Sequence, residues 1–528
     1  MQSRPFLTEA AAWLADVPTS GDPMYPVLCL SAFQVCMGLF DVVYHHELLC
    51  RLPWTPTAAD EQHIHAVRTA VYVAVYGCFA GVTPHGMLAY ALAAGLIAEI
   101  GVTCWDFVVE DRTRLFYPES ERITHTLMAI NYGAILGYFL PVLVGEWGAL
   151  PTGVELTTYG LFTPLYVGCA AGLGLWTVRD ELASRRLARF AEQPLPALPL
   201  QTKPARRVLI AGGSGFVGMH LSRCLLNEGH AVTVVTRDRA ATMRRFQLMR
   251  PAPACAGGEL TLVGSVAALG DGARFDAVVN LAGAPLVGRK WTPERVAEIF
   301  DSRVGATREL VALMARMRTK PEAFVCGSAV GAYGVGLDEV IDGEDSAPLE
   351  TKSLSYRLCA AWEGEAREAE KLGVRTVMVR TGVVLGRDGG ALAQMLPAFE
   401  AFAGGPMGSG KQGMSWIHVD DAARAIAFAA DNDAVHGAIN LTAPAPATGN
   451  EFAKSLGAAL GRPAVVRIPS PAVRALFGDA GEELLLGGSL VLPKKLLAHG
   501  FAFEHPELAG ALAHIVDARH SASCENKI

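Results

Sequence analysis

The chain has 528 residues, which is enough for two or more domains with separate hydrophobic cores. Its net charge is −7, and it has no stripe of lysine and arginine interleaved with aromatic residues, so we expect no nucleic-acid partner. The 11 cysteines are scattered without the paired spacing of a zinc site, and we expect most of them to be reduced and buried.

Five apolar segments occupy the first 180 residues. Each is about long enough to cross a hydrocarbon core of roughly 30 Å as an α-helix. They predict an all-α transmembrane bundle of about five helices within residues 1–190. The alternative is a soluble helical domain with an unusually apolar core. The segments are 26–49, 66–83, 86–109, 123–145 and 156–178.

The basic residues of this region predict its orientation. With five spans they all fall on one side of the bilayer, whereas 83–86 and 146–155, on the other side, contain neither lysine nor arginine. Because basic connections stay in the cytoplasm, we expect a multi-pass protein of the cell membrane with its N-terminus outside and its C-terminal half in the cytoplasm. The basic residues are Arg51, Arg68, Arg112, Arg114, Arg122, Arg179, Arg185, Arg186 and Arg189.

Carboxylates and imidazoles collect at the predicted cytoplasmic ends of these segments. Asp41 and His45 are spaced for one face of a helix, and so are Asp106 and Glu110. Such groups on facing helices of a bundle form di-iron and di-manganese sites. The candidate metal ligands are Asp41, His45, Asp106, Glu110 and His125.

Structural ion pairing is an alternative interpretation of the same groups, which can snorkel to the interface and pair with Arg112, Arg114 and Arg122. Glu99 should lie about 10 Å deeper than Asp106, given the rise per residue of an α-helix. A carboxylate at that depth needs a partner. A quinone or haem site is a third interpretation.

A proline-bearing stretch separates the apolar region from the rest of the chain. Its prolines disfavour a helix and favour an extended linker. We therefore divide the chain into a membrane helical domain (1–190), a linker (191–206), a nucleotide-binding domain (207–465) and a small C-terminal domain (466–520). The prolines are Pro194, Pro196, Pro199 and Pro204.

The stretch "RVLIAGGSGFVGMHL" (207–221) has the pattern of a strand, a glycine turn and a helix. The glycines let the backbone turn tightly and approach a pyrophosphate, which rests on the helix N-terminus. The strand that follows, "AVTVVTR", predicts the βαβ unit of a dinucleotide-binding fold. The candidate cofactor-binding residues here are Gly212, Gly213, Ser214, Gly215, Phe216, Val217 and Gly218.

That second strand ends in Thr236 and Arg237 rather than in an acid. An acid would bind the ribose 2′-hydroxyl of NAD(H), whereas an arginine suits the 2′-phosphate of NADP(H). We therefore favour NADP(H), with NAD(H) as the alternative, and Arg239 is placed to share the task. We also assign Leu281, Ala282 and Gly283, which follow a third strand, to the cofactor site.

Further apolar strands alternate with helical patterns such as 292–303. This alternation predicts an α/β Rossmann-type, doubly wound domain with a parallel sheet. The strands lie within 275–285, 322–334 and 375–386.

From about residue 207 to 516 the chain resembles the short-chain dehydrogenase/reductase superfamily in its extended form, and within it the atypical sugar-nucleotide-epimerase-like family with its small C-terminal domain. The matching stretches are "AGGSGFVG", "NLAGAPLVGRKWTPERVAEIFDSRV", "RTGVVLG", "GGPMGSGKQGMSWIHVDD", "AINLTAP" and "LFGDAGEELLLGGSLVLPKKLLAHGFAFEHPELAGAL". The resemblance implies NAD(P)-dependent oxidoreductase or epimerase chemistry on a small-molecule substrate, either sugar-nucleotide-like or membrane-associated. It implies nothing about the oligomeric state.

The chain departs from that superfamily at its usual tyrosine and lysine, which lie four residues apart. In "SLSYRLCAAWEGEAREAE" one alignment puts Ser355 and Cys359 at these positions, and another pairs Tyr356 with Ala360. Neither supplies the lysine that lowers the tyrosine pKa for proton transfer.

The nearest hydroxyl and phenol are those of Ser328 and Tyr333, which are our catalytic candidates. Ser328 matches the superfamily's active-site serine, whereas Tyr333 is equally compatible with packing. Lys290 is a possible acid, and His418 is more compatible with fixing the fold around the substrate cleft.

Three functions fit these observations. The first is a membrane-anchored NADP(H)-dependent oxidoreductase or epimerase that acts at the cytoplasmic membrane face. The second is a two-centre redox protein, in which the nucleotide serves a metal or quinone site in the bundle. The third is a nucleotide-sensing or scaffold protein without turnover, which the missing tyrosine and lysine would explain.

Overall fold

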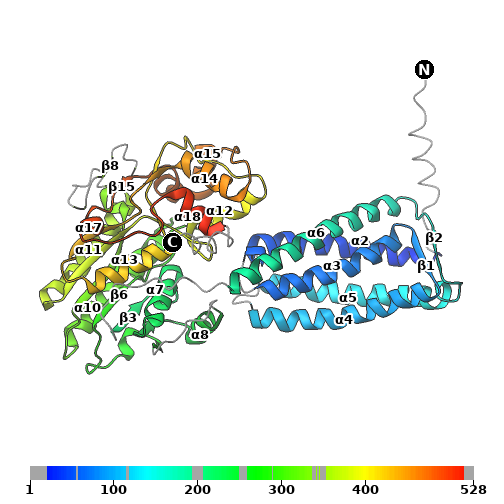
Figure 1. The fold of residues 1–528 in the computed structure, drawn as a ribbon, viewed down its shortest axis with the longest axis horizontal. Helices are drawn as coiled ribbons and strands as arrows, with labels where there is room; N and C mark the ends of the chain where they lie inside the picture. The colour runs from blue at the N-terminus through cyan, green and yellow to red at the C-terminus, as the bar shows by residue number, and fades with distance from the viewer. Residues whose placement is uncertain are drawn as a thin grey trace, which may run out of the picture. The chain divides into compact units, whose positions relative to one another are not determined.

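The protein is described by a computed structural model, in which the chain forms two compact units, Met1–Gln193 and Pro194–Ile528 (Figure 1). Two of the basic residues that predict the membrane orientation, Arg51 and Arg114, lie outside the described residues. Most of the predicted linker does so as well. The described residues are 21–50, 52–54, 58–113, 118–192, 206–248, 258–287, 289–335, 340–341, 344 and 352–516.

The N-terminal unit consists of long helices that run alongside one another (Figure 1). Two of them end in π-helical turns, η1 and η4. The strands β1 and β2 pair antiparallel at one end of the unit. The elements are α2 (Met24–Phe40) with η1 (Asp41–Leu49), α3 (Ala59–Phe79), β1 (Val82–His85), α4 (Met87–Thr113), α5 (Glu119–Pro141) with η4 (Val142–Trp147), β2 (Gly153–Leu156) and α6 (Phe162–Glu192).

Among the described residues of this unit, three helical spans are long and apolar enough to cross a membrane: Met24–Glu47, Met87–Thr113 and Glu119–Trp147. Their outward faces are apolar, as Leu39, Ile97 and Leu127 show at 63%, 56% and 46% exposure. The predicted five crossings are therefore not confirmed. The helices α3 and α6 are not among these spans.

The C-terminal unit is built on a parallel sheet of seven strands in the order β13-β9-β7-β6-β3-β4-β5. This sheet confirms the predicted α/β Rossmann-type domain. The strands are β3 (Arg207–Ala211), β4 (Ala231–Val235), β5 (Glu259–Val263), β6 (Ala277–Asn280), β7 (Ala323–Ala329), β9 (Arg375–Thr381) and β13 (Gly437–Leu441).

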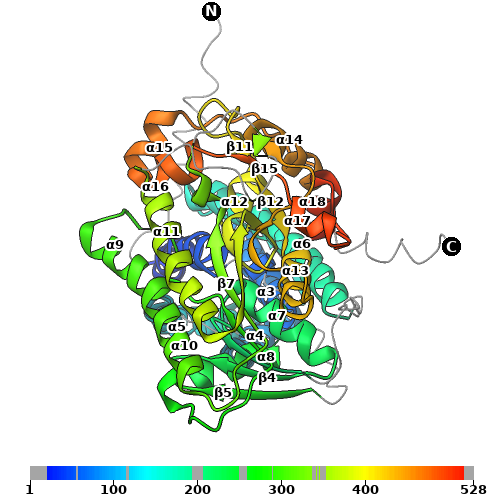
Figure 2. The same ribbon diagram turned by 90° about the vertical axis from the view of Figure 1, so that its left-hand side faces the viewer.

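Helices cover both faces of this sheet (Figure 2). Alternate residues of a strand face opposite sides, so Val208 and Ile210 of β3 pack with the cluster that includes α7 and α13. Leu209 packs on the other face with α10 and α11. The helices of this unit up to the end of the sheet are α7 (Phe216–Asn227), α8 (Arg239–Leu248), α9 (Pro293–Phe300), α10 (Ala306–Arg316), α11 (Leu354–Arg367), α12 (Gly390–Glu400) and α13 (Val419–Asp431).

A second, smaller core forms where the end of the chain packs on segments that follow β9. Leu392 of α12, Phe452 of α14 and Leu512 of α18 are buried together there. Three short strand pairs flank this core: β10–β12, β11–β14 and β8–β15. The elements are β8 (Val340–Ile341), β10 (Val383–Leu385), β11 (Gly413–Met414), β12 (Trp416–His418), β14 (Ala447–Thr448), α14 (Gly449–Leu460), α15 (Ser470–Phe477), α16 (Asp479–Gly481), β15 (Leu490–Val491), α17 (Lys494–Ala498) and α18 (Leu508–Val516).

Candidate functional site

The glycine turn lies between β3 and α7, beside the crossover from β3 to β6. Gly212 has a φ of +80°, and a Cβ on it would lie 2.5 Å from the carbonyl carbon of Leu281. A Cβ on Gly218 would lie 2.2 Å from the Gly212 oxygen. Both positions therefore require glycine, and the tight turn that they allow lies at the carboxyl ends of the strands, where parallel sheets bind nucleotides.

The remaining residues of this turn form the start of α7. Gly215 precedes the helix in an extended conformation, so the Phe216 and Val217 amides belong to its first turn. The carbonyl of Ser214 accepts a hydrogen bond of 2.8 Å from Arg245 of α8. Sequence analysis missed Arg245, although the basic pair that contains it lies in the first helix after the second strand.

The end of β4 presents Thr236 and Arg237. The Thr236 hydroxyl is buried, donates to the Asp238 carbonyl and lies 2.7 Å from the Thr242 hydroxyl. Arg237 and Arg239 are both exposed. The Arg237 side chain is therefore accessible to an external anion. The hydrogen bonds of Thr236 fix the turn in which Arg237 lies.

The loop after β6 completes the candidate nucleotide site. The Leu281 amide, just beyond β6, donates to the Ala211 carbonyl at the end of β3. The Ala282 amide donates to the Asn280 side chain. A Cβ on Gly283 would lie 2.7 Å from the Arg303 guanidinium carbon. The structure therefore brings all twelve predicted cofactor-binding residues to the turns that follow β3, β4 and β6 and to the first turn of α7.

Arg303 is a buried cation at this loop that sequence analysis missed. Its guanidinium stacks over Trp362 at 5.4 Å and donates to the Ile299 carbonyl. Burial, aided by the positive charge of Arg295, lowers the pKa of Arg303 to about 10. Arg303 therefore stays charged at neutral pH and makes the loop attractive to an anion.

The catalytic candidates Ser328 and Tyr333 meet around one ion pair. Ser328, at the end of β7, donates a 2.8 Å hydrogen bond to Glu363 of α11. Arg380 of β9 holds the same carboxylate through two contacts of 2.8 and 3.0 Å. Burial alone would raise the pKa of Glu363, but the hydrogen bonds from Arg380 and Ser328 hold it below its usual value.

Tyr333 is almost fully buried, at 1% exposure. Its hydroxyl donates to the Asn440 side chain at 2.7 Å, and its ring lies under the Arg380 guanidinium at 4.7 Å. Burial raises the pKa of Tyr333, so the phenol holds its proton at neutral pH. These contacts favour a structural role for the phenol.

The positions aligned with the usual tyrosine and lysine have other contacts here. The Ser355 hydroxyl donates to Glu483 at 2.6 Å. Cys359 donates to the Ala329 carbonyl, and burial raises the pKa of its thiol to about 11. The thiol is therefore protonated at neutral pH, and neither residue replaces a lysine that binds ribose. Sequence analysis missed Glu483, which no motif indicated.

The two possible acids are placed differently. Lys290 is exposed in the loop that precedes α9. His418 is buried at the end of β12, where burial lowers its pKa to about 3. A neutral imidazole cannot donate as a general acid near pH 7. The predicted role of His418 in fixing the fold agrees better with these surroundings.

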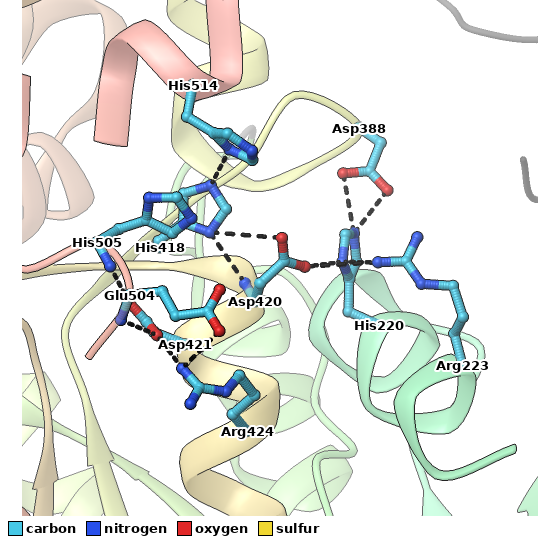
Figure 3. Close-up of polar contacts among 10 residues, drawn as sticks. All are labelled: His220, Arg223, Asp388, His418, Asp420, Asp421, Arg424, Glu504, His505 and His514. Carbon is cyan, nitrogen blue, oxygen red and sulfur yellow. Dashed lines mark hydrogen bonds and ion pairs between the residues drawn. The ribbon is translucent and has the colours of Figure 1, made fainter. Parts of the chain in front are cut away.

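A chain of polar contacts runs from the glycine-turn helix to the end of the chain (Figure 3). His220 of α7 lies between Asp388 and Asp420, at 2.9 and 3.0 Å. His418 continues the chain to His514 of α18, at 3.3 Å. Burial alone would lower the pKa of His220, but the two carboxylates raise it to about 9, so this imidazole is charged at neutral pH.

His418, His505 and His514 converge as metal ligands do, with candidate ligand atoms within 4.8 Å of one another. However, Nδ1 of His418 accepts a hydrogen bond from the Asp420 amide. In the neutral imidazole the other nitrogen, Nε2, then carries the proton and donates toward His514. The arrangement is therefore a hydrogen-bonded chain rather than a metal centre.

The predicted metal ligands of the N-terminal unit divide into two environments. Asp41, Glu110 and His125 meet in one buried cluster, where His125 lies 3.0 Å from Asp41 and 3.9 Å from Glu110. Nδ1 of His45 lies 2.7 Å from Oδ1 of Asp41, and Nε2 of His45 lies 2.9 Å from the Ser120 hydroxyl. Asp106 lies instead beside a cation.

That cation is Arg68, which contacts Asp106 at 2.5 Å and Glu99 at 3.3 Å. Tyr72 and Thr103 also donate to Glu99, at 2.7 and 2.8 Å. The deep carboxylate predicted to need a partner therefore has one. Sequence analysis assigned Arg68 to the cytoplasmic flank and missed this role, because hydropathy gives no sign of a buried ion pair.

A glycine turn beside the crossover of a doubly wound parallel sheet defines an NAD(P)-binding α/β protein. Comparison with known proteins supports the assignment to this class. The model of the NAD-dependent epimerase/dehydratase family matches residues 208–441, and a domain of unknown function, DUF1731, matches residues 468–515.

Several curated relatives carry the name epimerase family protein SDR39U1 or its homologue, and two of them illustrate the similarity. The human protein is 39% identical over 59% of this chain and 99% of its own length. The chloroplastic homologue from Arabidopsis thaliana is 38% identical over 60% of this chain and 88% of its own length. A crystal structure of human SDR39U1 with NADPH has a TM-score of 0.52 and 36% identity, and it covers 59% of this chain and 99% of that chain. This chain therefore belongs to the SDR39U1-type family of NAD(P)-dependent epimerase-like proteins, with a DUF1731 domain at its C-terminal end.

Proposed function

We propose that the C-terminal unit is an NADP(H)-dependent oxidoreductase or epimerase. The observation that carries the proposal is the exposed Arg237 at the end of β4, where an NAD(H)-specific site would have an acid. The NADPH in the human relative's structure supports the same choice of cofactor. The substrate class that fits the family is a sugar nucleotide or a membrane-associated small molecule.

The residues of this chain fit such a cofactor. Gly212 and Gly218 let the turn pack closely against the neighbouring backbone, and the first turn of α7 would supply amides to the pyrophosphate. Arg237 would bind the 2′-phosphate, and the loop at Gly283 would contact the adenosine half. When bound, the nicotinamide donates or accepts a hydride. Ser328, held by the ionised Glu363, would orient a substrate hydroxyl.

The experiment compares NADPH and NADH binding to full-length protein and to Arg237→Ala. Losing a charge-assisted contact of about 1.5–3 kcal/mol should weaken NADPH binding roughly 10- to 100-fold and leave NADH binding nearly unchanged. The control is Arg308→Ala, which removes an exposed arginine that pairs with Glu365. Equal losses for both nucleotides would show that Arg237 does not select the cofactor.

We also propose that the N-terminal unit anchors this domain in the cell membrane, with the N-terminus outside and the nucleotide domain in the cytoplasm. The three apolar helical spans support the anchor, and the arginines all fall on the cytoplasmic side when α3 and α6 cross the membrane as well. A cysteine introduced at Arg112 and one introduced at Arg308 should both react only with a membrane-permeant thiol reagent in intact cells. Opposite labelling of the two positions would contradict the topology.

A non-catalytic, nucleotide-sensing function is the second candidate. The protonated Cys359 and the Glu483-bound Ser355 favour it, because they supply no substitute for the usual tyrosine and lysine. The deciding measurement is the transfer of deuterium from 4-deuterated NADPH to sugar nucleotides or membrane lipids. Transfer to any acceptor excludes a purely sensing function, and its absence across the panel supports one.

A further inference from the structure

We infer that the N-terminal unit binds two adjacent divalent transition-metal ions, of the iron or manganese class, in the core of its helix bundle. Two groups of buried carboxylates and imidazoles there have candidate ligand atoms within 4.8 Å of one another inside each group. They come from four helices, α2 with η1, α3, α4 and α5. The first group is Asp41, His46, Glu121 and His125, and the second is Glu61, His65 and Glu110.

The first group surrounds a common point. His46 Nε2 lies 3.3 Å from Asp41 Oδ2 and 3.2 Å from Glu121 Oε1. His125 Nε2 lies 3.0 Å from the same Asp41 oxygen. All four residues of this group are at most 8% exposed. Two imidazole nitrogens and two carboxylates make a ligand set that suits iron or manganese.

The second group lies on α3 and α4. Glu61 and Glu110 are at most 2% exposed, and the His65 side chain is 10% exposed. His65 Nε2 lies 4.0 Å from Glu61 Oε1. The same nitrogen is buried and lies 3.5 Å from Asp106 Oδ2, the carboxylate oxygen that Arg68 also contacts. A buried imidazole nitrogen that faces carboxylate oxygens is placed as the nitrogen of a metal-binding histidine is.

The two groups are neighbours. The rings of His46 and His65, one from each group, stack with centroids 4.7 Å apart. Glu110 Oε1 of the second group lies 3.9 Å from His125 Nδ1 of the first. Two ions held by such groups would be close enough to share a carboxylate. This is the arrangement of dimetal centres in helix bundles, where glutamates and histidines project inward from facing helices.

The charges of the two groups fit a pair of divalent ions. The groups contain four carboxylates, those of Asp41, Glu61, Glu110 and Glu121. Neutral imidazoles bind metals, so two ions of charge +2 would balance the four carboxylates. The nearby Arg68 is held by Glu99 and Asp106, which lie outside both groups.

The π-helical segment η1 explains how one helix provides two of these ligands. In a π-helix the backbone hydrogen bonds join residues five apart. Asp41 and His46, which are five apart, therefore lie along one side of η1, and His45 contacts the other Asp41 oxygen at 2.7 Å. His45 in turn lies 2.9 Å from Ser120. His45 thus orients a ligand without being one, as partners outside the ligand set do in metal sites.

The test uses full-length protein in mild detergent, freed of metal with a chelator and titrated with Mn²⁺ without oxygen. Bound metal is counted by mass spectrometry after gel filtration, and electron paramagnetic resonance reports whether the ions are coupled. We expect two Mn²⁺ per chain and the spectrum of a spin-coupled pair. Fewer than two ions per chain, or two with the six-line spectrum of isolated Mn²⁺, would overturn the pair.

Variants assign the ligands. Glu121→Gln and Glu61→Gln remove one carboxylate from the first and second group, and each should lower the stoichiometry to one ion or none. The control is His63→Gln on α3, because the His63 side chain is 58% exposed and pairs with Glu181 outside both groups. This variant should keep two ions. If a group variant fails to give a monodisperse protein, the wild-type count and spectrum still decide the inference, and unchanged binding in both group variants would refute it.

Discussion

The close approach at Gly218 makes the nucleotide turn sensitive to a single methyl group. In Gly218→Ala the new Cβ would meet the Gly212 carbonyl oxygen 2.2 Å away, which the backbone must move to avoid. We expect NADPH binding to fall at least roughly 100-fold, because the turn would no longer hold the amides of α7 against a pyrophosphate. Isothermal titration measures this loss.

A matched control for that variant is Gly364→Ala in α11. Apart from the neighbouring backbone of α11 itself, no atom lies within 4 Å of its Cβ position, so alanine fits there without a clash. Alanine also favours the helix by about 1 kcal/mol. The control should therefore bind NADPH normally and unfold at a slightly higher temperature. A loss of binding in both variants would show that the measurement reports general damage.

Tyr333→Phe distinguishes a packing role of Tyr333 from a role of its phenol in proton transfer. The variant removes the hydrogen bond to Asn440 and leaves the ring under Arg380. We expect the free energy of unfolding to fall by about 1–2 kcal/mol, because Asn440 loses a buried partner, while NADPH affinity stays the same. Chemical denaturation and nucleotide titration check the two halves. A loss of hydride transfer at unchanged stability would instead restore the phenol as a catalytic group.

Glu363→Gln probes the ion pair that Ser328 and Tyr333 share. Arg380, which is mostly buried, would lose the charge that holds it. Breaking a buried pair by removing one partner costs roughly 3–5 kcal/mol. We expect a loss of this order in chemical denaturation, much larger than that of Ser328→Ala, for which about 1 kcal/mol is expected. Similar losses in the two variants would show that Glu363 carries little of the pairing energy.

At the scale of elements, the contacts of α7 with α13 predict how stability depends on pH. The pKa of His220 is raised to about 9, so its contribution is complete below about pH 6.5 and is lost as the pH rises through 9. The pKa of His418 is lowered to about 3, so its contribution is complete above about pH 6.5 and is lost as the pH falls. The C-terminal unit should therefore be most stable near pH 6.5, and its stability should fall both toward pH 9 and toward pH 3.

Thermal unfolding of the full chain from pH 5 to pH 10 tests this window. In His220→Asn the decline between about pH 6.5 and 9 should flatten, since the loss assigned to this imidazole, on the order of 3 kcal/mol, would disappear. His499→Asn, at the end of α17 and outside the network of Figure 3, should keep the wild-type profile. An unchanged alkaline decline in His220→Asn would assign it to other groups.

The elements that sequence predicted best are those whose pattern is local. Each buried parallel strand is a short apolar run, so strands such as 207–211 and 277–280 were predictable, as was the glycine turn that follows the first of them. The prediction for α3 was incomplete, because hydropathy placed its start at residue 66. The helix begins at Ala59, and its polar first turns carry Glu61 and His65 of the proposed metal groups.

Other features depend on contacts that no local pattern encodes. The i, i+4 spacing indicated Asp41 and His45 as a pair, which the structure shows, but the π-helical turn also brings His46 to Asp41. The strand pair β1–β2 joins residues more than 60 positions apart in four-residue segments without alternation. Arg303 and Glu483 likewise gain their contacts only when distant segments fold together.

At the scale of the whole molecule, each unit has its own core, since the buried cluster of the helical unit contains no residue of the sheet. The human relative is matched over 99% of its length by only 59% of this chain. We therefore expect a fragment of residues 194–528 to fold alone, to remain in the supernatant without detergent and to bind NADPH with the affinity of the full chain. Aggregation of that fragment would mean that the sheet depends on the helices.

The winding of η1 has one more consequence. A nine-residue π-helical stretch in a helix that is otherwise α-helical amounts to roughly one surplus amino acid. Excising Val42 would let the backbone return to ordinary α-helical winding without turning the residues beyond it about the axis. In such a shortened chain His46 would follow Asp41 by four positions and stay on the same side of the helix, so the loss of one codon would remove the π-helical turn and keep the two side chains together.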